Sequence, residues 1–363
     1  MESKLAELLC GYSLELKRGD LTLIRGEACA IPLIRACYRA ALKMGAYPSV
    51  QISYPEQSAD LFKYGETHQF QYISEIDKVQ ADVLNAQITI DSTSNAKQLT
   101  GANPADIALF QQAKGSLRQR MFDREEKGSF KWIIAPYPTH SMAQEAEMSF
   151  EEYSEFVFNA CKLHLDEPIK AWQAVGAFQE GIKNLLSVGS VLRIVGERTD
   201  LTVDFSGRIW RNSCGHRNMP DGEVFTSPLS ANGSIYFDIP ANYNGVEAVG
   251  VYLEFEQGRV VRAEAQKGGN FLLKMLDLDE GARFIGEIAF GLNDNITRPT
   301  KNILFDEKIG KTIHLAVGAA YKEAGGTNIS GLHWDLIKDM RKDAYVELDG
   351  KLIYKDGNFK LNQ

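Results

Sequence analysis

Side chains that could bind metal ions recur in the C-terminal half of the chain, and "SGLHWDL" (residues 330–336) is one example. It places His333 and Asp335 one residue apart. If the stretch is a strand, both side chains point the same way, roughly 6–7 Å apart at the backbone, and can reach one ion. An imidazole beside a carboxylate suits Zn²⁺, Co²⁺ or Mn²⁺. A buried histidine beside a turn-forming aspartate would also explain this stretch.

Two apolar runs each contain one titratable side chain. Glu287 lies in "FIGEIAF", where a carboxylate must be paired, hydrogen-bonded or metal-bound, because burying a bare charge is costly. His314 lies in "TIHLAVG", and the alternation of a strand puts it on one face with Ala316 and Gly318. These small neighbours leave room beside the imidazole. A hydrogen-bonded core histidine is the alternative for His314.

A fifth candidate, Glu223, follows the turn Pro-Asp-Gly in "NMPDGEVFTSPL". It stands at the start of a strand-like run, where a solvated carboxylate would also be ordinary. The candidates together supply three carboxylates and two imidazoles: Glu223, Glu287, His314, His333 and Asp335. A lone catalytic zinc takes three protein ligands. Five ligands fit two divalent ions about 3.5–4 Å apart, whose charge three carboxylates and one hydroxide balance.

Other common catalytic signatures are missing from the sequence. It has no GxSxG, no HExxH, no GxxxxGK[ST] and no GxGxxG after a strand. The five cysteines are scattered without a CxxC pair, which argues against a disulfide framework and against a cysteine zinc site. Serine or cysteine nucleophiles and phosphate-binding loops therefore have no support.

The composition of the chain indicates which partners and which cellular compartment to expect. The net charge is −8 and no long run of lysine and arginine occurs, so we expect no nucleic-acid partner. The N-terminus lacks the apolar core of a signal peptide, and no apolar run reaches the ~18 residues of a membrane span. We therefore expect a cytoplasmic protein without a membrane partner.

The elements that must position these residues change in kind along the chain. Up to about residue 189, strand-like runs alternate with helical ones. The runs 21–26, 47–53, 82–91 and 130–138 predict strands, and the runs 27–45, 104–122, 149–164 and 170–187 predict helices. This alternation predicts an α/β domain, residues 1–189, with a mostly parallel sheet. From residue 190 to 363, strand-like runs joined by glycine-containing turns predict a β-rich α+β domain that holds the metal ligands. The clearest helix expected there spans 269–281.

Several stretches resemble the aminopeptidase T/aminopeptidase S family of dinuclear metallopeptidases, the thermophilic aminopeptidases. The similarity is dense from about residue 190 to the C-terminus. It is carried by "GERTDLTVDFSGRIWRN", "NMPDGEVFTSP", "RFIGEIAFGLN", "FDEKIGKTIHLAVGAAY" and "GGTNISGLHWDLI". It is looser before that, as in "APYPTHSMAQEAEMSFEEYSEF". Several motifs in consistent order are far more specific than a single HxD.

The resemblance implies that Glu223, Glu287, His314, His333 and Asp335 are the metal ligands, with Glu287 as the bridge. It also implies a role at the metals for the tyrosine seven residues after His314, Tyr321, whose hydroxyl could bind an ion or the oxyanion and whose alternative is a packing aromatic. Two Zn²⁺ or Co²⁺ ions are expected, with Mn²⁺ as a further candidate. Family members are homodimeric exopeptidases that act on peptides. The stretch "DEKIGKTIH" departs from the small residues more usual before that histidine.

The predicted function is a metal-dependent aminopeptidase that removes N-terminal amino acids from short peptides. A general base must also move a proton to the leaving amine. Glu223 and Glu307 are both candidates, and Glu307 could be a surface residue. The alternatives are a dinuclear hydrolase of another amide or ester, and a non-catalytic protein with a structural metal site.

Overall fold

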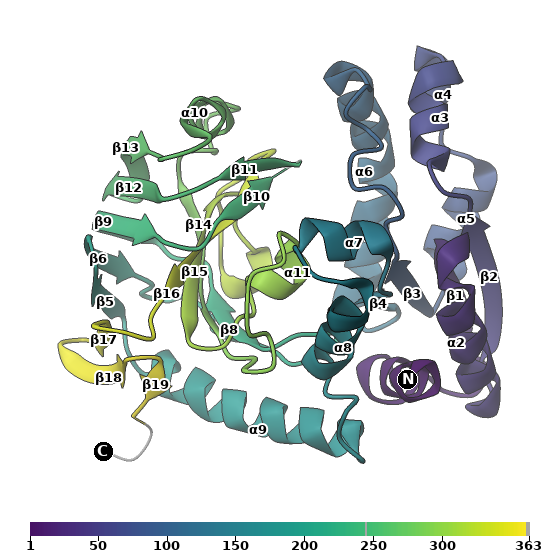
Figure 1. Cartoon of the computed structure of the whole chain (residues 1–363), viewed down its shortest axis with the longest axis horizontal. Coiled ribbons are helices and arrows are strands. Elements are labelled where there is room, and N and C mark those ends of the chain that lie inside the picture. The colour runs from purple at the N-terminus through teal and green to yellow at the C-terminus, as the bar shows by residue number, and fades with distance from the viewer. Residues whose placement is uncertain (244, 361–363) are drawn as a thin grey trace. The chain divides into compact units, whose positions relative to one another are not determined.

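The computed structural model describes residues 1–243 and 245–360, which form two compact units (Figure 1). The first unit comprises Met1–Ile169 and Gly215–Met219, and the second comprises Lys170–Cys214 and Pro220–Gln363. Nearly all of helix α9 (Pro168–Ser187) therefore belongs to the second unit, whereas the predicted boundary after residue 189 assigns it to the first. As a boundary between independently folding domains, residue 189 stays a prediction.

A four-stranded parallel sheet forms the centre of the first unit. Its strands are β1 (Leu21–Glu27), β2 (Tyr47–Ser53), β3 (Ala86–Asp91) and β4 (Lys131–Pro136), in the order β2-β1-β3-β4. All three pairings between neighbours are parallel. The predicted N-terminal α/β domain with a mostly parallel sheet is confirmed.

Helices precede, connect and follow the strands of this sheet along the chain. They are α1 (Glu2–Glu7), α2 (Ile31–Lys43), α3 (Gln57–Tyr64), α4 (Thr67–Phe70), α5 (Glu75–Val83), α6 (Pro104–Glu126), α7 (His140–Glu145) and α8 (Phe150–Ala160). A π-helix spans Leu8–Ser13. Ser149 caps α8 in a capping box with Glu152, at the start of the predicted helical run 149–164. The strand predicted over 82–91 is too long at its start, because the chain is still helical at Val83 and pairs only from Ala86.

The second unit contains an eight-stranded antiparallel sheet. Its strands are β5 (Val191–Gly196), β6 (Thr199–Asp204), β9 (Ser230–Phe237), β12 (Val251–Glu256), β13 (Arg259–Glu264), β17 (Tyr345–Leu348), β18 (Lys351–Lys355) and β19 (Asn358–Phe359). They are ordered β13-β12-β9-β6-β5-β17-β18-β19. Two of the predicted glycine-containing turns, "EQG" and "LDGK", join β12 to β13 and β17 to β18. A separate pair is formed by β10 (Ala241–Tyr243) and β11 (Val246–Ala248).

A five-stranded antiparallel sheet carries the candidate residues. Its strands are β7 (Arg211–Ser213), β8 (Glu223–Thr226), β14 (Ile285–Gly291), β15 (Thr312–Gly318) and β16 (His333–Asp339), ordered β16-β15-β14-β8-β7. One face contributes Ile288, Leu315 and Trp334 to an apolar core shared with the eight-stranded sheet. Helix α9 and helix α10 (Gly269–Leu276) also add side chains to this core. The predicted β-rich α+β architecture is confirmed.

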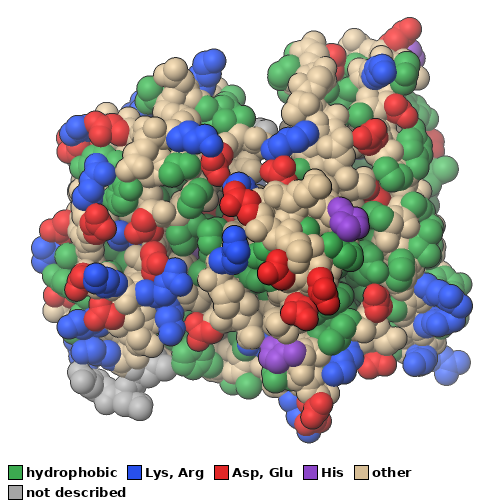
Figure 2. All heavy atoms as spheres, viewed as in Figure 1, with side chains coloured by type: hydrophobic (Ala, Val, Ile, Leu, Met, Phe, Trp, Pro, Cys, Tyr) green, Lys and Arg blue, Asp and Glu red, His purple; other side chains and the backbone are tan. Residues whose placement is uncertain are grey.

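One face of the molecule carries charges of both signs. On the face shown in Figure 2, lysine and arginine side chains alternate with carboxylates. Among the described residues, no helix is both long enough and apolar enough to cross a membrane.

Candidate metal centre

Four neighbouring strands bring the five predicted ligands onto the second face of the five-stranded sheet. His333 and Asp335 lie on β16, His314 on β15, Glu287 on β14 and Glu223 at the start of β8. The residues opposite three of them are small: Ala289 pairs with His314, Ala316 with Asp335, and Gly318 with His333. Small side chains at these cross-strand positions leave the space into which the imidazoles and carboxylates extend.

A β-bulge in β14 aims Glu287 at this face. Ile285 pairs with Val317 while Glu287 pairs with the adjacent Ala316, so Gly286 is an extra residue without an opposite partner. Without the bulge, the two-residue period would put Ile285 and Glu287 on one face. With it, Ile285 joins the apolar core and Glu287 faces the other way. A Cβ at Gly286 would lie 2.4 Å from the carbonyl oxygen of Ala319, so glycine is required there.

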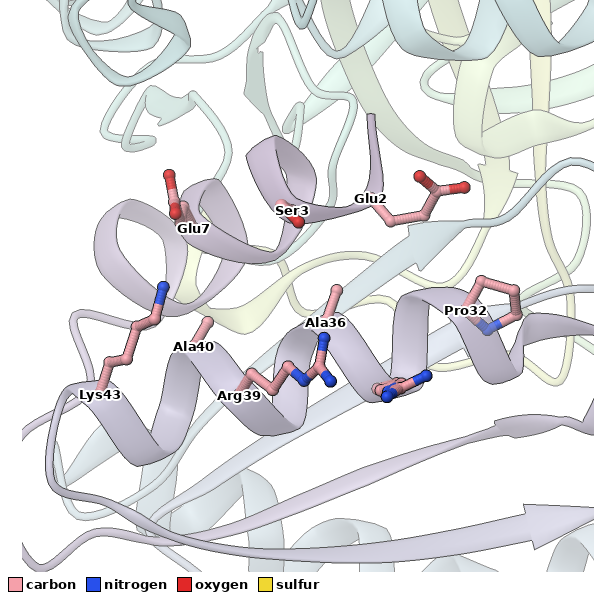
Figure 3. A pocket seen from close by; sticks show the side chains of 9 residues that line it. Glu2, Ser3, Glu7, Pro32, Ala36, Arg39, Ala40 and Lys43 are labelled. Carbon is pink, nitrogen blue, oxygen red and sulfur yellow. The ribbon is translucent and has the colours of Figure 1, made fainter.

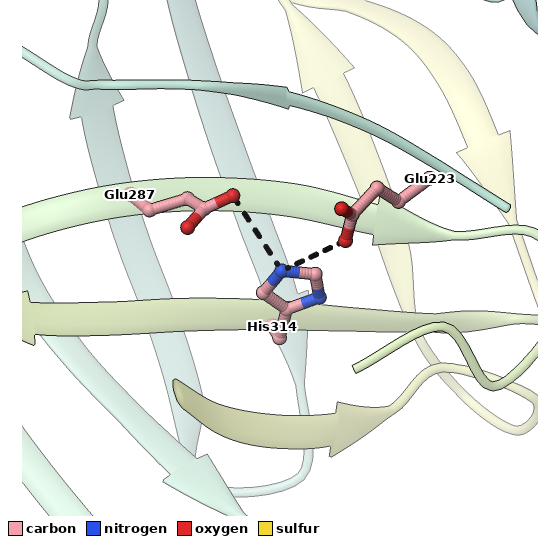
Figure 4. A group of neighbouring side chains, drawn as sticks. All are labelled: Glu223, Glu287 and His314. Atoms are coloured by element: carbon pink, nitrogen blue, oxygen red, sulfur yellow. Dashed lines mark ion pairs between the residues drawn. The ribbon is translucent and has the colours of Figure 1, made fainter. Parts of the chain in front are cut away.

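The first group of ligands consists of Glu223, Glu287 and His314 (Figure 4), whose ligand atoms lie within 4.8 Å of one another. His314 Nε2 is 3.4 Å from Glu223 Oε2 and 3.7 Å from Glu287 Oε1. All three residues are buried. Two carboxylate oxygens and one imidazole nitrogen converge on a space in which a cation could lie.

The second group consists of Glu287, His333 and Asp335, again with ligand atoms within 4.8 Å of one another. His333 Nε2 is 3.3 Å from Glu287 Oε2 and 3.5 Å from Asp335 Oδ1. Glu287 thus belongs to both groups. Its Oε1 faces His314 and its Oε2 faces His333.

The backbone orients the imidazole of His333. Its Nδ1 is 2.8 Å from the carbonyl oxygen of Ala319, so an N–H at Nδ1 can donate there and present Nε2 to the space among the carboxylates, where its lone pair would bind a metal. For His314, Nε2 also faces the carboxylates, while Nδ1 is buried with no hydrogen-bond partner among the described residues. The structure therefore shows an orienting acceptor for one of the two imidazoles.

Unsatisfied oxygens show that these residues fit a metal. Glu223 Oε2 and Asp335 Oδ1 are buried and accept no hydrogen bond from any described residue. Buried carboxylate oxygens without partners are expensive unless a cation satisfies them. The set of imidazole nitrogens and carboxylate oxygens matches the ligands that divalent transition metals prefer.

The charges of the centre shift the pKa values of its members. Burial raises the pKa of Glu223 to about 8. Burial lowers the pKa of His314, but the contacts with Glu287 and Glu223 outweigh it and raise the pKa to about 9. Burial likewise opposes the charged form of His333, yet Asp335 and Glu287 hold its pKa well above the ordinary value. Burial raises the pKa of Asp335, but the neighbouring His333 brings it down to about 2.

Tyr321 borders the second group. Its hydroxyl oxygen is 3.4 Å from His333 Nε2, and its ring meets those of His333 and Phe225 edge-on at 5.1 Å and 5.2 Å between centroids. Tyr321 is 40% exposed, whereas the carboxylates and His314 are buried. Tyr321 and His333 therefore form the side of the centre that solvent reaches.

Three further side chains lie at the centre. Lys308 and Gln179 were not predicted there, and Glu307 was predicted only as one candidate for the general base. Lys308 is fully buried, and its Nζ is 3.5 Å from Glu223 Oε1 and forms an ion pair with Glu307. Glu307 is thereby placed at the centre and not on the surface. Gln179, on α9, donates from Nε2 to the backbone carbonyl of Glu223 at 3.0 Å. The departure "DEKIG" was the sequence signal for Lys308, whereas Gln179 lies 44 positions from its partner and gave none.

Two hollows lie in the first unit. One, of about 420 Å³, lies between α1 and α2 (Figure 3), with Glu2 and Glu7 from one helix and Arg39 and Lys43 from the other. The other, of about 510 Å³, is lined by apolar and aromatic side chains together with charged ones such as Arg25, Asp77 and Lys114. Neither lining includes histidine or cysteine, so neither has the mixed ligand set of the centre in the second unit.

Comparison with known proteins identifies the class to which this fold and site belong. The model of the family described as thermophilic metalloprotease (M29) matches residues 2–359. The chain belongs to this family and is a metal-dependent peptidase.

The relatives make the class narrower. Aminopeptidase AmpS of Bacillus subtilis is 27% identical over 98% of this chain and 97% of its own length. Aminopeptidase T of Thermus thermophilus is 26% identical over 98% and 95%. The predicted family and the predicted enzyme class, a metallo-aminopeptidase, are confirmed.

Solved structures support the fold. The structure of wild-type AmpT from Thermus thermophilus superposes with a TM-score of 0.86 at 24% identity, covering 99% of this chain and 98% of that one. A 2,5-dihydroxypyridine dioxygenase from Pseudomonas putida KT2440 superposes with a TM-score of 0.60 at 12% identity, covering 100% and 97%. Both likenesses are of fold alone. Function must therefore be argued from the site.

Proposed function

We propose that the chain removes N-terminal amino acids from short peptides at a centre of two divalent metal ions. The observation that carries the two-ion proposal is the position of Glu287, whose two oxygens face two different histidines. One ion would be held by Glu223, Glu287 and His314, and the other by Glu287, His333 and Asp335. Glu287 would bridge them.

Bound divalent ions would supply an activated water and polarise the scissile carbonyl. The protein side chains do the rest. Tyr321 is exposed beside His333, so its hydroxyl is placed to donate a hydrogen bond to a carbonyl oxygen of the substrate. A free α-amino group of the substrate would dock at one of the ions or at a carboxylate beside them. This docking would make the enzyme an exopeptidase.

Of the two candidates for the general base, the geometry favours Glu307. Glu223 has one oxygen towards His314 and the other towards Lys308, so it is committed to the centre. Glu307 belongs to neither ligand group. Burial raises its pKa against the opposing charge of Lys308, which brings it nearer to the pH at which a base must work. In this proposal Glu307 takes a proton from the attacking water and passes it to the nitrogen of the leaving amine. Glu223 acts as a metal ligand.

The nature of the ions, the assembly and the compartment belong to the same proposal. A mixed nitrogen and oxygen ligand set suits Zn²⁺, Co²⁺ and Mn²⁺, which geometry and availability discriminate in cells. The chain is proposed to act as a homodimer in the cytoplasm, without a nucleic-acid partner. All five cysteines are free, which agrees with a reducing compartment.

Paired substrates test the exopeptidase proposal. Leucine p-nitroanilide and N-acetyl-leucine p-nitroanilide share the scissile amide and differ at the amino group. We expect cleavage of the first at a rate at least about 100-fold above the second, because the blocked substrate loses its positive charge. Comparable rates would instead favour a hydrolase of general amides or esters.

A further inference from the structure

Lys308 is the least expected side chain at the metal centre. It has no exposed side-chain surface, and lysine is almost never fully buried unless it is paired. Its Nζ is 3.5 Å from Glu223 Oε1 and pairs with Glu307 Oε1. This pairing with two carboxylates favours the charged, ammonium form of the side chain.

The backbone fixes the ammonium in place. Lys308 follows α11 (Ile303–Asp306); its N–H donates to the carbonyl of Phe305, and its carbonyl accepts from the N–H of Asn293, both at 3.0 Å. Asp306 ties the preceding turn together by accepting from the N–H groups of Thr300 and Lys301 at 2.7 and 2.8 Å. The backbone that carries Lys308 is thus held by hydrogen bonds, and this keeps the buried ammonium beside Glu223 and Glu307.

Glu223 is shared between this ammonium and the first ligand group. Its Oε2 faces His314 Nε2 at 3.4 Å, while its Oε1 faces Lys308. An oxygen paired with an ammonium is less available to a second cation. In the other group the charge of Lys308 reaches Asp335 only at longer range, because no described lysine or arginine forms an ion pair with Asp335 or His333. The two groups therefore differ in charge balance although each has three side chains.

We propose that Lys308 is an internal cation that competes with metal for Glu223, so that the group Glu223–Glu287–His314 binds its ion more weakly than the group Glu287–His333–Asp335. This rests on the proposed two-ion function. In the metal-free protein the ammonium offsets the repulsion between the buried carboxylates. In the metal-loaded protein it repels the adjacent ion. The free-energy coupling between Lys308 and that ion is thus unfavourable, and it acts equally in both directions.

Lys308 could instead support metal binding, and removing it would then change the metal affinity in the opposite direction. If Lys308 mainly orients Glu223 and Glu307 for the metal, removing it would disorder the ligands and weaken binding. The sign of the change in metal affinity therefore discriminates competition from orientation. Activity alone would not, because both roles predict altered turnover.

Cobalt titration of the metal-free full chain tests the proposal, followed by calorimetry and by the visible absorbance of Co²⁺. We expect two phases in the wild-type protein, with the weaker one abolished by His314→Ala. Lys308→Met should tighten the weaker phase by about 5- to 150-fold, the usual range of such couplings, and leave the tighter phase within about threefold. The melting temperature of metal-free Lys308→Met should be below that of the wild-type protein. If the weaker phase of Lys308→Met has an unchanged or lower affinity, the proposal is overturned.

Two further variants keep the result interpretable. Lys338 is also a buried lysine, and its Nζ is 3.4 Å from Asp238 and 3.2 Å from the carbonyl of Tyr236. Lys338→Met should lower the melting temperature with and without metal while leaving both cobalt phases unchanged. If Lys308→Met does not fold, Lys308→Gln removes the same charge but keeps a hydrogen-bond donor, and the same tightening is expected. Cobalt binding without cleavage of leucine p-nitroanilide would count against the proposed function and not against the role of Lys308.

Discussion

Glu287 is the residue on which the division of the centre into two groups depends. It is buried inside an all-buried strand and presents one oxygen to each histidine. A carboxylate at this position would be a large liability in a protein without metal. The burial that made Glu287 conspicuous in the sequence is thus the property that a bridging ligand requires.

The protonation states of the ligands in the metal-free protein predict how metal affinity changes with pH. At pH 7 the metal-free centre holds protons on Glu223, whose pKa is about 8, on His314, whose pKa is about 9, and on His333. Metal ligands must be deprotonated, so binding releases these protons and affinity rises as pH increases from about 6 to 9. Calorimetric Zn²⁺ titration in buffers of different ionisation enthalpy should show release of about two to three protons at pH 7. No net release would contradict these protonation states.

Tyr321 gives a second prediction at the scale of one residue. Tyr321→Phe removes the hydroxyl that lies 3.4 Å from His333 Nε2 and keeps the ring contact with Phe225. If the hydroxyl donates to the reacting carbonyl, kcat for leucine p-nitroanilide should fall by about 100- to 1,000-fold. KM and the bound metal per chain should hardly change. Unaltered kcat would mean that Tyr321 is a packing aromatic.

Among the secondary-structure elements, the bulged strand β14 directs the Glu287 side chain towards the other ligands. Its bulge at Gly286 turns Glu287 out of the apolar core and turns Ile285 into it. On β16, in contrast, plain alternation suffices: His333 and Asp335 share one face, and Trp334 packs on the other face against Tyr243 and Phe271. The strand geometry therefore explains both the ligands and the packing residue between them.

Gly286→Ala tests the role of the bulge. The new Cβ would lie 2.4 Å from the Ala319 carbonyl oxygen, so the strand must shift at a cost of about 1–3 kcal/mol. We expect the unfolding free energy to fall by this amount in urea and the bound metal to drop below that of the wild-type protein. Gly181→Ala is the control, because nothing lies within 4 Å of its Cβ in α9. That change should stabilise the chain by about 0.5–1 kcal/mol, and a similar gain for Gly286→Ala would refute the role of the bulge.

The same elements show how far sequence reasoning reaches. The alternation on β16 depends only on the strand period, so the shared face of His333 and Asp335 was predictable from adjacent letters. The bulge was not, because the letters "FIGEIAF" do not record which residue loses its partner on β15. Lys308 escaped prediction because its partner Glu223 lies far along the chain and meets it only through the fold. Local periodicity is legible in a sequence, whereas register and long-range ion pairs are tertiary properties.

At the scale of the whole molecule, the second unit has an apolar core that does not depend on metal. The two larger sheets share a contiguous cluster of buried side chains, from Leu192 on β5 to Tyr354 on β18. The ligands lie on the opposite face of the five-stranded sheet. A core of this size distinguishes the unit from small domains that fold only around a metal.

Metal removal should therefore leave the fold in place. After treatment with a chelator, the far-ultraviolet circular dichroism at 25 °C should be unchanged. Metal present at about 1,000 times its Kd contributes about 4 kcal/mol, so chelation should lower the melting temperature by about 8–16 °C. Loss of the secondary-structure signal on chelation would indicate a structural metal site in place of a catalytic one.

The most direct test of the two-ion centre is the metal stoichiometry of activity. Metal-free protein is titrated with Co²⁺ while cleavage of leucine p-nitroanilide is followed, with Glu287→Gln in parallel. The wild-type activity should reach its plateau at about two equivalents per chain, and the variant should lose more than about 100-fold in kcat/KM, since loss of a ligand exceeds the usual effect of changing an outer partner. A plateau at one equivalent, or full activity in Glu287→Gln, would contradict a centre built on a bridging Glu287.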